Sequence, residues 1–242
     1  MGSSADLSGK VILVTGASRG IGHAVSLAVA QAGADVIVTG RTIGALEELD
    51  DAIKAIGAHA TIVEHDMSDF AALPRLAAAI HERWGRLDGL VANAAILGTL
   101  TPLSHLDQNV WDETISINLT AQWQLITAME PLLIAAPAGR ALLVSSGAAH
   151  GSYPFWGAYA VSKAGLEAMG RVWAGETEQT NLRVNMINPG GTATSMRAAA
   201  FPGEDPKTLP TPDAIAPAFL LLLSGSCQDH GQLFQARDML GL

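Results

Sequence analysis

Short runs of β-branched and aliphatic residues recur along the chain, separated by longer segments with helical spacing. The first run, residues 10–15, leads directly into glycines, which is typical of a buried parallel strand that feeds a helix. Five similar runs predict further strands at 35–39, 60–64, 87–92, 141–145 and 182–187. Segments rich in Ala and Leu predict helices at about 21–32, 43–56, 69–84, 108–134 and 158–179.

This alternation predicts an α/β fold with a mainly parallel sheet and helices on both faces. Right-handed crossovers leave a doubly wound Rossmann fold as the natural arrangement. No repeat or linker divides the chain, so we expect a single domain over residues 1–242. Pro131 is expected to kink the long fourth helix. The Pro- and Gly-rich stretch 189–213 predicts a loop over a site, a mobile lid near 192–212, with Thr211 and Pro212 restarting a helix.

Composition and charge narrow the range of partners. The net charge is −9 with no basic cluster, so nucleic acid is not expected. The apolar stretches are shorter than a membrane span, and the first residues lack the order of a secretory signal, so no membrane partner is expected either. Cys227 is the only cysteine, which fits a reducing compartment, and we expect a cytoplasmic protein. The seven histidines show no ligand spacing, so no metal site is expected.

A glycine-rich turn joins the first strand to the first helix, with the sequence Thr-Gly-Ala-Ser-Arg-Gly-Ile-Gly over residues 15–22. Gly16 permits the tight turn, Gly20 allows close approach of the backbone to phosphate, and Gly22 lets the helix pack on the strand. Backbone N–H groups around Ser18 and Ile21 then hold a pyrophosphate at the helix N-terminus. The turn therefore predicts a dinucleotide site.

The end of the second strand bears on the choice between NADP(H) and NAD(H). An acidic residue there would bind the ribose hydroxyl of NAD, but this chain has Arg41 and no carboxylate. Arg19, in the glycine turn, can approach the same point. Each contact to a 2′-phosphate is worth about 1.5–3 kcal/mol, which favours NADP(H) and leaves NAD(H) possible. The alternative is that both arginines are solvated surface residues.

Two further strand ends carry candidate cofactor contacts. Asp66 follows the third strand, where it can accept from an adenine amino group or serve as an ordinary helix cap. Asn93 and Ala94 follow the fourth strand, where an amide and small residues can form the floor of a cofactor pocket or simply make a turn.

Tyr159 and Lys163 lie four residues apart and therefore on one face of a predicted helix, with the ammonium beside the phenol. Such a phenol is a candidate for proton transfer in carbonyl–alcohol chemistry, while nicotinamide carries hydride. Lowering its pKa from about 10 to about 7 costs about 4 kcal/mol. A cation about 6 Å away supplies about 3 kcal/mol at an effective dielectric constant of about 20, which matters but is not enough alone. Ser146, at the end of the fifth strand, is placed to hydrogen-bond a substrate oxygen.

Together these motifs resemble the short-chain dehydrogenase/reductase family over essentially the whole chain. The matching positions are Gly16, Gly20, Gly22, Asn93, Ala94, Ala95, Asn118, Ser146, Tyr159, Lys163, Pro189 and Gly190. The segment 231–234 resembles the family's last strand, which brings the expected sheet to seven strands. Residues 188–202 resemble a bacterial subgroup of oxidoreductases without an assigned substrate. The chain departs from commoner members at 236–239, where their Asp-Gly-Gly tail is replaced by Ala-Arg-Asp-Met.

The resemblance implies four catalytic residues, with Tyr159 as the acid/base and Ser146 polarising the carbonyl. It implies that Lys163 also binds the nicotinamide ribose and that Asn118 anchors a water linking Lys163 to solvent. Pro189, Gly190, Thr192 and Thr194 would flank the nicotinamide.

The expected function is an NADP(H)-dependent oxidoreductase acting on a small carbonyl compound or secondary alcohol. His150 and Trp156 lie where the resemblance locates the substrate wall, although core or interface packing explains them equally well. The resemblance also implies a homodimer or homotetramer paired through the long fourth helix and the Tyr159 helix. The alternative function is a sensor or scaffold that binds NAD(P) without turnover.

Overall fold

Seven parallel strands form one sheet at the centre of the computed structural model, which describes residues 5–242. Their order is β3-β2-β1-β4-β5-β6-β7, so the direction of winding reverses between β1 and β4. The strands are β1 (Val11–Thr15), β2 (Asp35–Gly40), β3 (Ala60–Glu64), β4 (Gly89–Ala92), β5 (Arg140–Val144), β6 (Arg183–Asn188) and β7 (Leu233–Gln235). The prediction of a doubly wound, seven-stranded sheet is confirmed.

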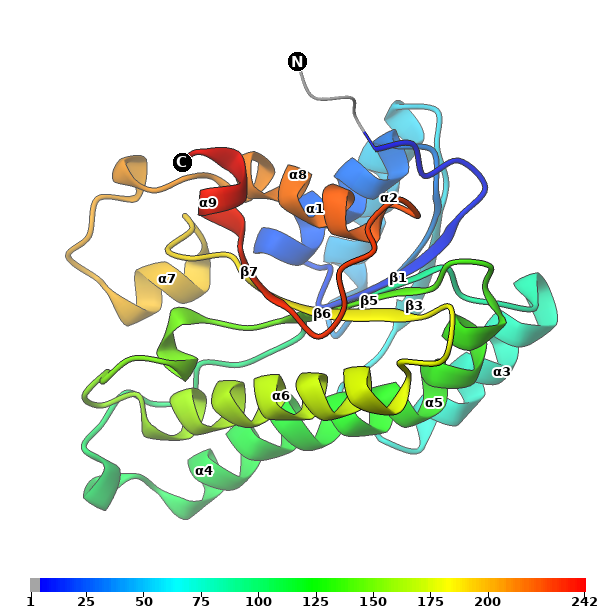
Figure 1. Ribbon diagram of the computed structural model, residues 1–242. Coiled ribbons are helices and arrows are strands. Elements are labelled where there is room, and N and C mark those ends of the chain that lie inside the picture. The colour runs from blue at the N-terminus through cyan, green and yellow to red at the C-terminus, as the bar shows by residue number, and fades with distance from the viewer. Residues whose placement is uncertain (1–4) are drawn as a thin grey trace.

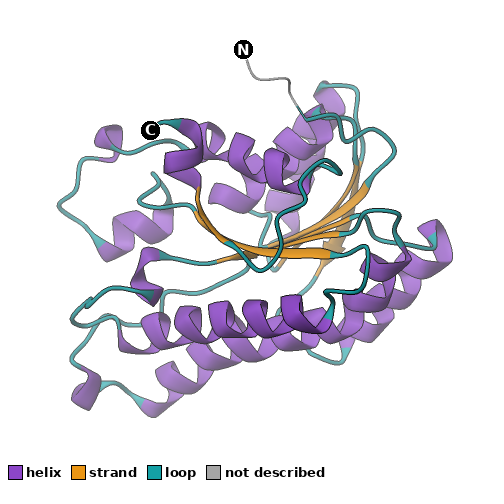
Figure 2. Cartoon of the chain, viewed as in Figure 1, coloured by secondary structure: helices purple, strands orange, loops and turns teal. Residues whose placement is uncertain are grey.

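Helices cover both faces of the sheet (Figures 1 and 2). One layer holds α1 (Gly20–Gln31), α2 (Ile43–Ala55), α8 (Pro212–Leu223) and α9 (Ala236–Leu240). The other holds α3 (Ala72–Trp84), α4 (Gln108–Ile115), α5 (Ala121–Ala135) and α6 (Gly157–Glu176). The short α7 (Ser195–Ala200) lies beyond one end of the sheet. Within residues 5–242, no helix has the length and apolar character needed to cross a bilayer.

Two hydrophobic cores share the sheet, because alternate side chains of each strand point to opposite faces. Ile12 and Val14 of β1 belong to the core under α1 and α8, whereas Val11 and Leu13 belong to the core under α5 and α6. All residues of β1 are buried, as expected of a parallel strand covered on both sides. This double coverage explains why the strands appear in the sequence as continuous apolar runs.

The predicted helix over 108–134 is divided in the structure. A π-helical segment, Ser116–Thr120, separates α4 from α5. The helix α5 continues through Pro131 as far as Ala135, and the carbonyl that Pro131 leaves without a donor belongs to Thr127, an exposed residue. The helix is thus interrupted at the π segment, whereas it is continuous through Pro131.

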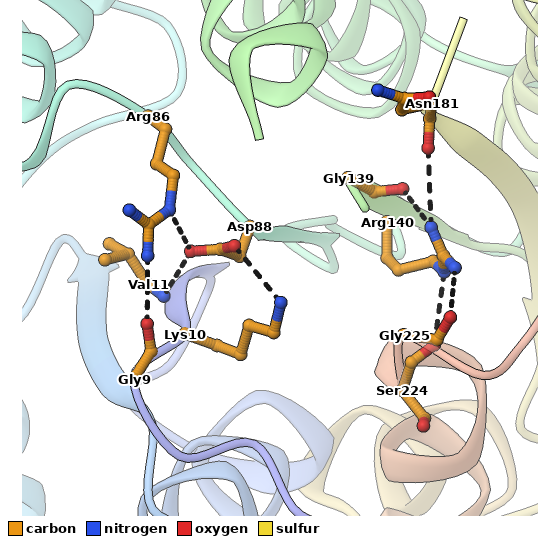
Figure 3. A network of polar contacts seen from close by, with 10 residues as sticks. All are labelled: Gly9, Lys10, Val11, Arg86, Asp88, Gly139, Arg140, Asn181, Ser224 and Gly225. Carbon is orange, nitrogen blue, oxygen red and sulfur yellow. Dashed lines mark hydrogen bonds and ion pairs between the residues drawn. The ribbon is translucent and has the colours of Figure 1, made fainter. Parts of the chain in front are cut away.

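Two buried charged residues anchor the amino-terminal edge of the sheet (Figure 3). Asp88, just before β4, accepts from the backbone N–H of Val11 and from Arg86 Nε, both at 3.0 Å. Arg140, at the start of β5, donates to the carbonyl oxygens of Gly139, Ser224 and Gly225 at 2.8–3.1 Å. These contacts tie strand beginnings to loops, and they leave the opposite, carboxyl edge of the sheet for a ligand.

Candidate active site

A cavity of about 470 Å³ opens at the carboxyl edge of the sheet, around the point where the winding reverses. This is where open α/β sheets bind ligands. Its walls come from the residues that follow β1, β2, β3, β4 and β6, from the end of β5, from α6 and from the loop before α7. The predicted site residues that line it are Gly16, Ser18, Arg19, Gly20, Ile21, Arg41, Asp66, Asn93, Ala94, Tyr159, Lys163, Pro189 and Thr194. Seven other predicted residues lie outside this lining: Gly22, Asn118, Ser146, His150, Trp156, Gly190 and Thr192.

The glycine turn has the backbone that its sequence predicts. Gly16 and Gly20 adopt positive φ angles of 66° and 57°, a region that glycine occupies at little cost. A Cβ on Gly22 would lie 2.3 Å from the carbonyl oxygen of Gly16, so only glycine allows α1 to pack this closely on the turn. Arg19, the N-cap residue of α1, makes no side-chain cap, and the first N–H groups of this helix are left for a ligand.

Asn93 holds the glycine turn from the neighbouring strand. Its Nδ2 donates to the carbonyl oxygens of Thr15 (2.9 Å) and Gly16 (3.2 Å). The backbone N–H groups of Asn93 and Ala94 donate to Thr15 Oγ1 at 3.0 and 3.1 Å. Asn93 therefore connects the ends of β1 and β4 and fixes the shape of the cavity floor.

Two arginines and one carboxylate line the part of the cavity next to β2 and β3. Arg41 and Arg19 both line it, as predicted, and Arg41 is exposed. Asp66 Oδ1 accepts from the backbone N–H and the hydroxyl of Ser68, both at 2.8 Å, and these hydrogen bonds lower the pKa of Asp66. Asp66 thus caps a turn and also lines the cavity.

The residues around this cavity fit the phosphate groups of a dinucleotide. Uncapped N–H groups begin α1, a helix of 12 residues, and two guanidinium groups stand nearby. At Gly20 a Cβ would approach Thr194 Cγ2 to 3.3 Å, so a larger residue would crowd the space between the turn and the loop before α7. Both features suit an anionic ligand held by the backbone.

Tyr159 and Lys163 extend from successive turns of α6 into the same cavity. Lys163 Nζ lies 5.9 Å from the centre of the Tyr159 ring, close to the predicted separation. Burial raises the pKa of the Tyr159 phenol above its usual value, and a hydrogen bond with Ser146 opposes this rise. In the protein alone desolvation therefore outweighs the favourable contacts of the phenol, and Lys163 was not expected to lower the phenol pKa far enough by itself.

Lys163 is buried and its ammonium donates to the carbonyl oxygen of Val144 at 2.7 Å. Desolvation lowers the pKa of Lys163 to about 8, and the negative charge of Glu167 opposes that shift. The lysine therefore titrates much closer to neutrality than an exposed one, which makes its charge sensitive to nearby groups.

Asn118 lies in the π-helical segment and is fully buried. Its Oδ1 accepts from the backbone N–H of Ile96, and its Nδ2 donates to the carbonyl of Ile96, both at 2.8 Å. The same Nδ2 donates to Ser162 Oγ at 3.1 Å. The Asn118 side chain thus ties the π segment to the loop after β4 and to α6, and π turns of this kind occur frequently at functional sites.

None of the three predicted substrate residues lines the main cavity, and two of them, Ser146 and Trp156, lie beside Tyr159. Ser146 Oγ accepts from the backbone N–H of Ala148 at 3.2 Å and caps a short 3-10 turn. The Trp156 ring meets Tyr159 edge-on at 5.7 Å between centres and also contacts Phe201 at 5.6 Å. His150 Nε2 instead forms a hydrogen bond of 2.8 Å with Glu167, a buried carboxylate.

The stretch 189–213 is only partly a loop. Thr194 Oγ1 accepts from the backbone N–H of Arg197 at 3.1 Å and caps α7. Gly190 has a φ of 74°, and Thr192 Oγ1 donates to its carbonyl oxygen at 3.3 Å. Thr211 Oγ1 accepts from Ala214 N at 3.2 Å, so the predicted helix restart is confirmed.

Sequence reasoning missed several residues of this site. Met67, Ile96, Ile117 and Met196 add apolar surface to the cavity. Ser145 also lines it, and its hydroxyl donates to Glu167. Glu167 stands eight residues after Tyr159, on the same face of the helix, and this spacing is the signal that could have found it. Among residues 5–242, no group of three or more His, Cys, Asp or Glu side chains is arranged to hold a metal ion.

Comparison with known proteins identifies the family to which this chain is similar. Residues 10–205 match the family model for short chain dehydrogenases. The uncharacterized oxidoreductase YciK of Escherichia coli is 39% identical over 235 residues, which cover 96% of this chain and 93% of that protein. A short chain dehydrogenase from Escherichia coli solved in complex with NADPH is 39% identical, with a TM-score of 0.94 over 98% of this chain and 100% of that one.

A second solved structure, a short chain dehydrogenase from Shigella flexneri in complex with NADP, is also 39% identical. Its TM-score is 0.93, over 97% of this chain and 100% of that one. The sheet order, the glycine turn and the Tyr159–Lys163 pair agree with these similarities. The chain belongs to the short-chain dehydrogenase family of oxidoreductases.

Proposed function

We propose that this protein is an NADP(H)-dependent oxidoreductase that interconverts a carbonyl compound and a secondary alcohol, with Tyr159 as the general acid/base. The observation that carries the proposal is the joint presence of Tyr159 and Lys163 in one cavity with the glycine turn and two arginines. Related structures contain NADPH or NADP, which supports the same cofactor here. The bound nicotinamide supplies the hydride, and the protein supplies binding, orientation and the proton.

Tyr159 suits proton donation to a carbonyl oxygen that gains negative charge. Burial raises its pKa, so the phenol is protonated at neutral pH and has a proton to give. Ser146 hydrogen-bonds the phenol and stands beside it to orient the substrate oxygen. Lys163, held against the Val144 carbonyl, places a cation near the phenolate that proton transfer leaves behind. The Asn118 side chain is already engaged with Ile96, in the loop after β4, and with Ser162 of α6. A water in the proposed proton relay would therefore be held there by main-chain atoms.

Arg41 and Arg19 are proposed to bind the 2′-phosphate of NADP(H), with NAD(H) as a weaker ligand. Asp66, on the same side, is proposed to accept from adenine with the oxygen not engaged by Ser68. The test is a titration with NADPH and NADH, followed by nicotinamide fluorescence, in the wild type and in Arg41→Asp. Loss of one charge-assisted contact should weaken NADPH binding by about 10- to 100-fold, with no loss for NADH.

Arg83→Asp, near the end of α3 and beside Thr61 at the start of β3, is the matched control for this titration. It makes the same change of charge at an exposed position outside the cavity. Its affinities should stay within about twofold of the wild type, since distant surface charges are screened. An Arg41→Asp variant that keeps the wild-type preference for NADPH would contradict the assignment of Arg41. Failure of the wild type to bind either cofactor would remove the oxidoreductase proposal.

A substrate wall of aromatic residues and a lid over 192–212 belong to the same proposal. Trp156 contacts both Tyr159 and Phe201, and Phe201 follows α7, so the wall and the lid segment meet beside the phenol. This arrangement favours an apolar or aromatic substituent on the substrate carbonyl. A sensor or scaffold without turnover stays the alternative, and a Tyr159→Phe variant that fulfils the protein's cellular role would favour it.

A homodimer or homotetramer in the cytoplasm completes the proposal. Exposed apolar side chains recur at intervals of eleven residues on α5 (Trp123, Ile134) and on α6 (Val161, Val172), and this spacing puts each pair on one helix face. Such stripes are typical of subunit interfaces. Light scattering at micromolar concentration should give twice or four times the chain mass of 25.1 kDa, and a monomer would refute this.

A further inference from the structure

Three successive turns of α6 hold three successive residues at the end of β5. Tyr159 hydrogen-bonds Ser146, Lys163 donates to the carbonyl of Val144, and Glu167 accepts from the hydroxyl of Ser145. Positions 159, 163 and 167 are spaced by four and so share one helix face. Glu167 is therefore the third member of a row whose first two members line the cavity.

Glu167 is an unusual residue for its surroundings, because its side chain is only 1% exposed. A buried carboxylate is costly unless hydrogen bonds and opposite charges compensate for lost hydration. Here Oε1 accepts from Ser145 and from His150 Nε2 (2.8 Å), while Arg171 Nη1 lies 3.6 Å from Oε2. His150 and Arg171 reach solvent, and Ser145 lines the cavity, so the carboxylate joins the protein surface to the site.

The charge of Glu167 also acts on Lys163, one turn away. Lys163 is buried, and desolvation opposes its protonated form. Glu167 is the charged group that counteracts this desolvation. The other charged or titratable groups that face the carboxylate, His150 and Arg171, lie on its outer side and are half exposed. A neutral residue at 167 would thus remove the negative charge near the ammonium and leave its hydrogen bond to the Val144 carbonyl.

We propose that Glu167 is a positioning residue of the active site: its carboxylate fixes Ser145, and with it the strand end that carries Ser146, and its charge acts on Lys163 one helical turn away. His150, a candidate for either the substrate wall or packing, is in this account the outer support of Glu167. The catalytic consequence rests on the proposed oxidoreductase function, whereas the effect on Lys163 does not require turnover.

The test compares Glu167→Gln with Glu176→Gln, which removes the same charge at an exposed position near the end of α6. Gln keeps an acceptor for Ser145 and removes the charge. The affinity for NADPH should weaken as Lys163 loses its proton, so a plot of log Kd against pH should bend near the pKa of Lys163, about 8 in the wild type. In Glu167→Gln the bend should move to lower pH by about one to two units. Glu176→Gln should match the wild type.

A Glu167→Gln curve that bends at the wild-type pH overturns the proposal, because a purely structural role would lower affinity without moving the bend. If the wild type binds NADPH but reduces no carbonyl, the proposed function fails while this curve still decides on Glu167. If NADPH does not bind, the Lys163 titration is measured instead as the difference in unfolding free energy between each protein and its Lys163→Met version across pH. The same downward shift is then expected for Glu167→Gln, and an unmoved titration overturns the proposal.

Ser145→Ala decides the matter if Glu167→Gln does not fold. With phenanthrenequinone as the carbonyl probe, loss of this anchor should lower kcat about tenfold, since small misplacements of a catalytic group are costly. Ser145→Thr, which keeps the hydroxyl that donates to Glu167, should recover most of the lost rate. A wild-type kcat in Ser145→Ala would overturn the proposal.

Discussion

Gly22→Ala tests how closely the glycine turn and α1 must fit, and the structure supplies the magnitude. The added Cβ would lie 2.3 Å from the Gly16 carbonyl oxygen and 2.6 Å from Asn93 Nδ2. Both distances fall about 1 Å short of ordinary contact, and the atoms concerned are backbone and a hydrogen-bonded amide, which cannot rotate away. The start of α1 must therefore move by about 1 Å.

Forced overpacking of this kind costs about 1–3 kcal/mol, while replacing Gly by Ala in a helix returns about 0.5–1 kcal/mol. We expect Gly22→Ala to lose about 1–2 kcal/mol of unfolding free energy in urea titrations. Because the displaced turn carries the expected phosphate contacts, the Kd for NADPH should rise about tenfold or more.

Gly44→Ala is the matched control, because a Cβ at Gly44, in the first turn of α2, meets nothing within 4 Å. It should gain up to about 1 kcal/mol and leave the Kd unchanged. The steric argument would be refuted if Gly22→Ala equalled the wild type in both measurements, or if Gly44→Ala lost as much stability as Gly22→Ala.

Two further predictions concern buried cations. Arg140→Met should lower the unfolding free energy by about 2–4 kcal/mol, because the carbonyls of Gly139, Ser224 and Gly225 lose their donor. Arg140→Lys should recover only part of this loss. A loss below about 0.5 kcal/mol for Arg140→Met in urea titrations would contradict the prediction. Lys163 has a pKa of about 8 in the folded protein, against the ordinary lysine value of 10.5, so the unfolded chain binds more protons between these pH values. The cofactor-free wild type should therefore gain about 2–3 kcal/mol relative to Lys163→Met as pH rises from about 8 to about 10.5. Parallel stability curves for the two proteins across that window would show that Lys163 is not desolvated.

Patterns local in the sequence predicted most of the fold. The apolar runs located six strands, and β1, β4 and β5 are buried throughout, as expected of parallel strands covered on both faces. The edge strand β3 is only half-buried and was located by its β-branched residues. The seventh, Leu233–Gln235, is short and half-buried, and it was expected only from the family resemblance. The glycine turn was predictable because positive φ angles at Gly16 and Gly20 are a local requirement.

Features that depend on tertiary contacts were not predictable in the same way. The π segment at 116–120 is held by Asn118 through Ile96 and Ser162, residues distant in the sequence. The Tyr159–Lys163 pair follows from helical spacing, but the raised phenol pKa follows from burial, which spacing does not reveal. His150 was a candidate for the substrate wall because it lies between Ser146 and Tyr159, whereas its hydrogen bond to Glu167 depends on the packing of α6 on β5.

The central claim is that Tyr159 transfers the proton in an NADPH-dependent carbonyl reduction, and Tyr159→Phe tests it most directly. The phenyl ring keeps the edge contact with Trp156 and removes the hydroxyl, so NADPH affinity should stay within about twofold of the wild type. The rate of NADPH oxidation with a carbonyl probe should fall by about 10²- to 10⁴-fold, the usual contribution of a positioned general acid. Wild-type turnover in Tyr159→Phe would contradict the account.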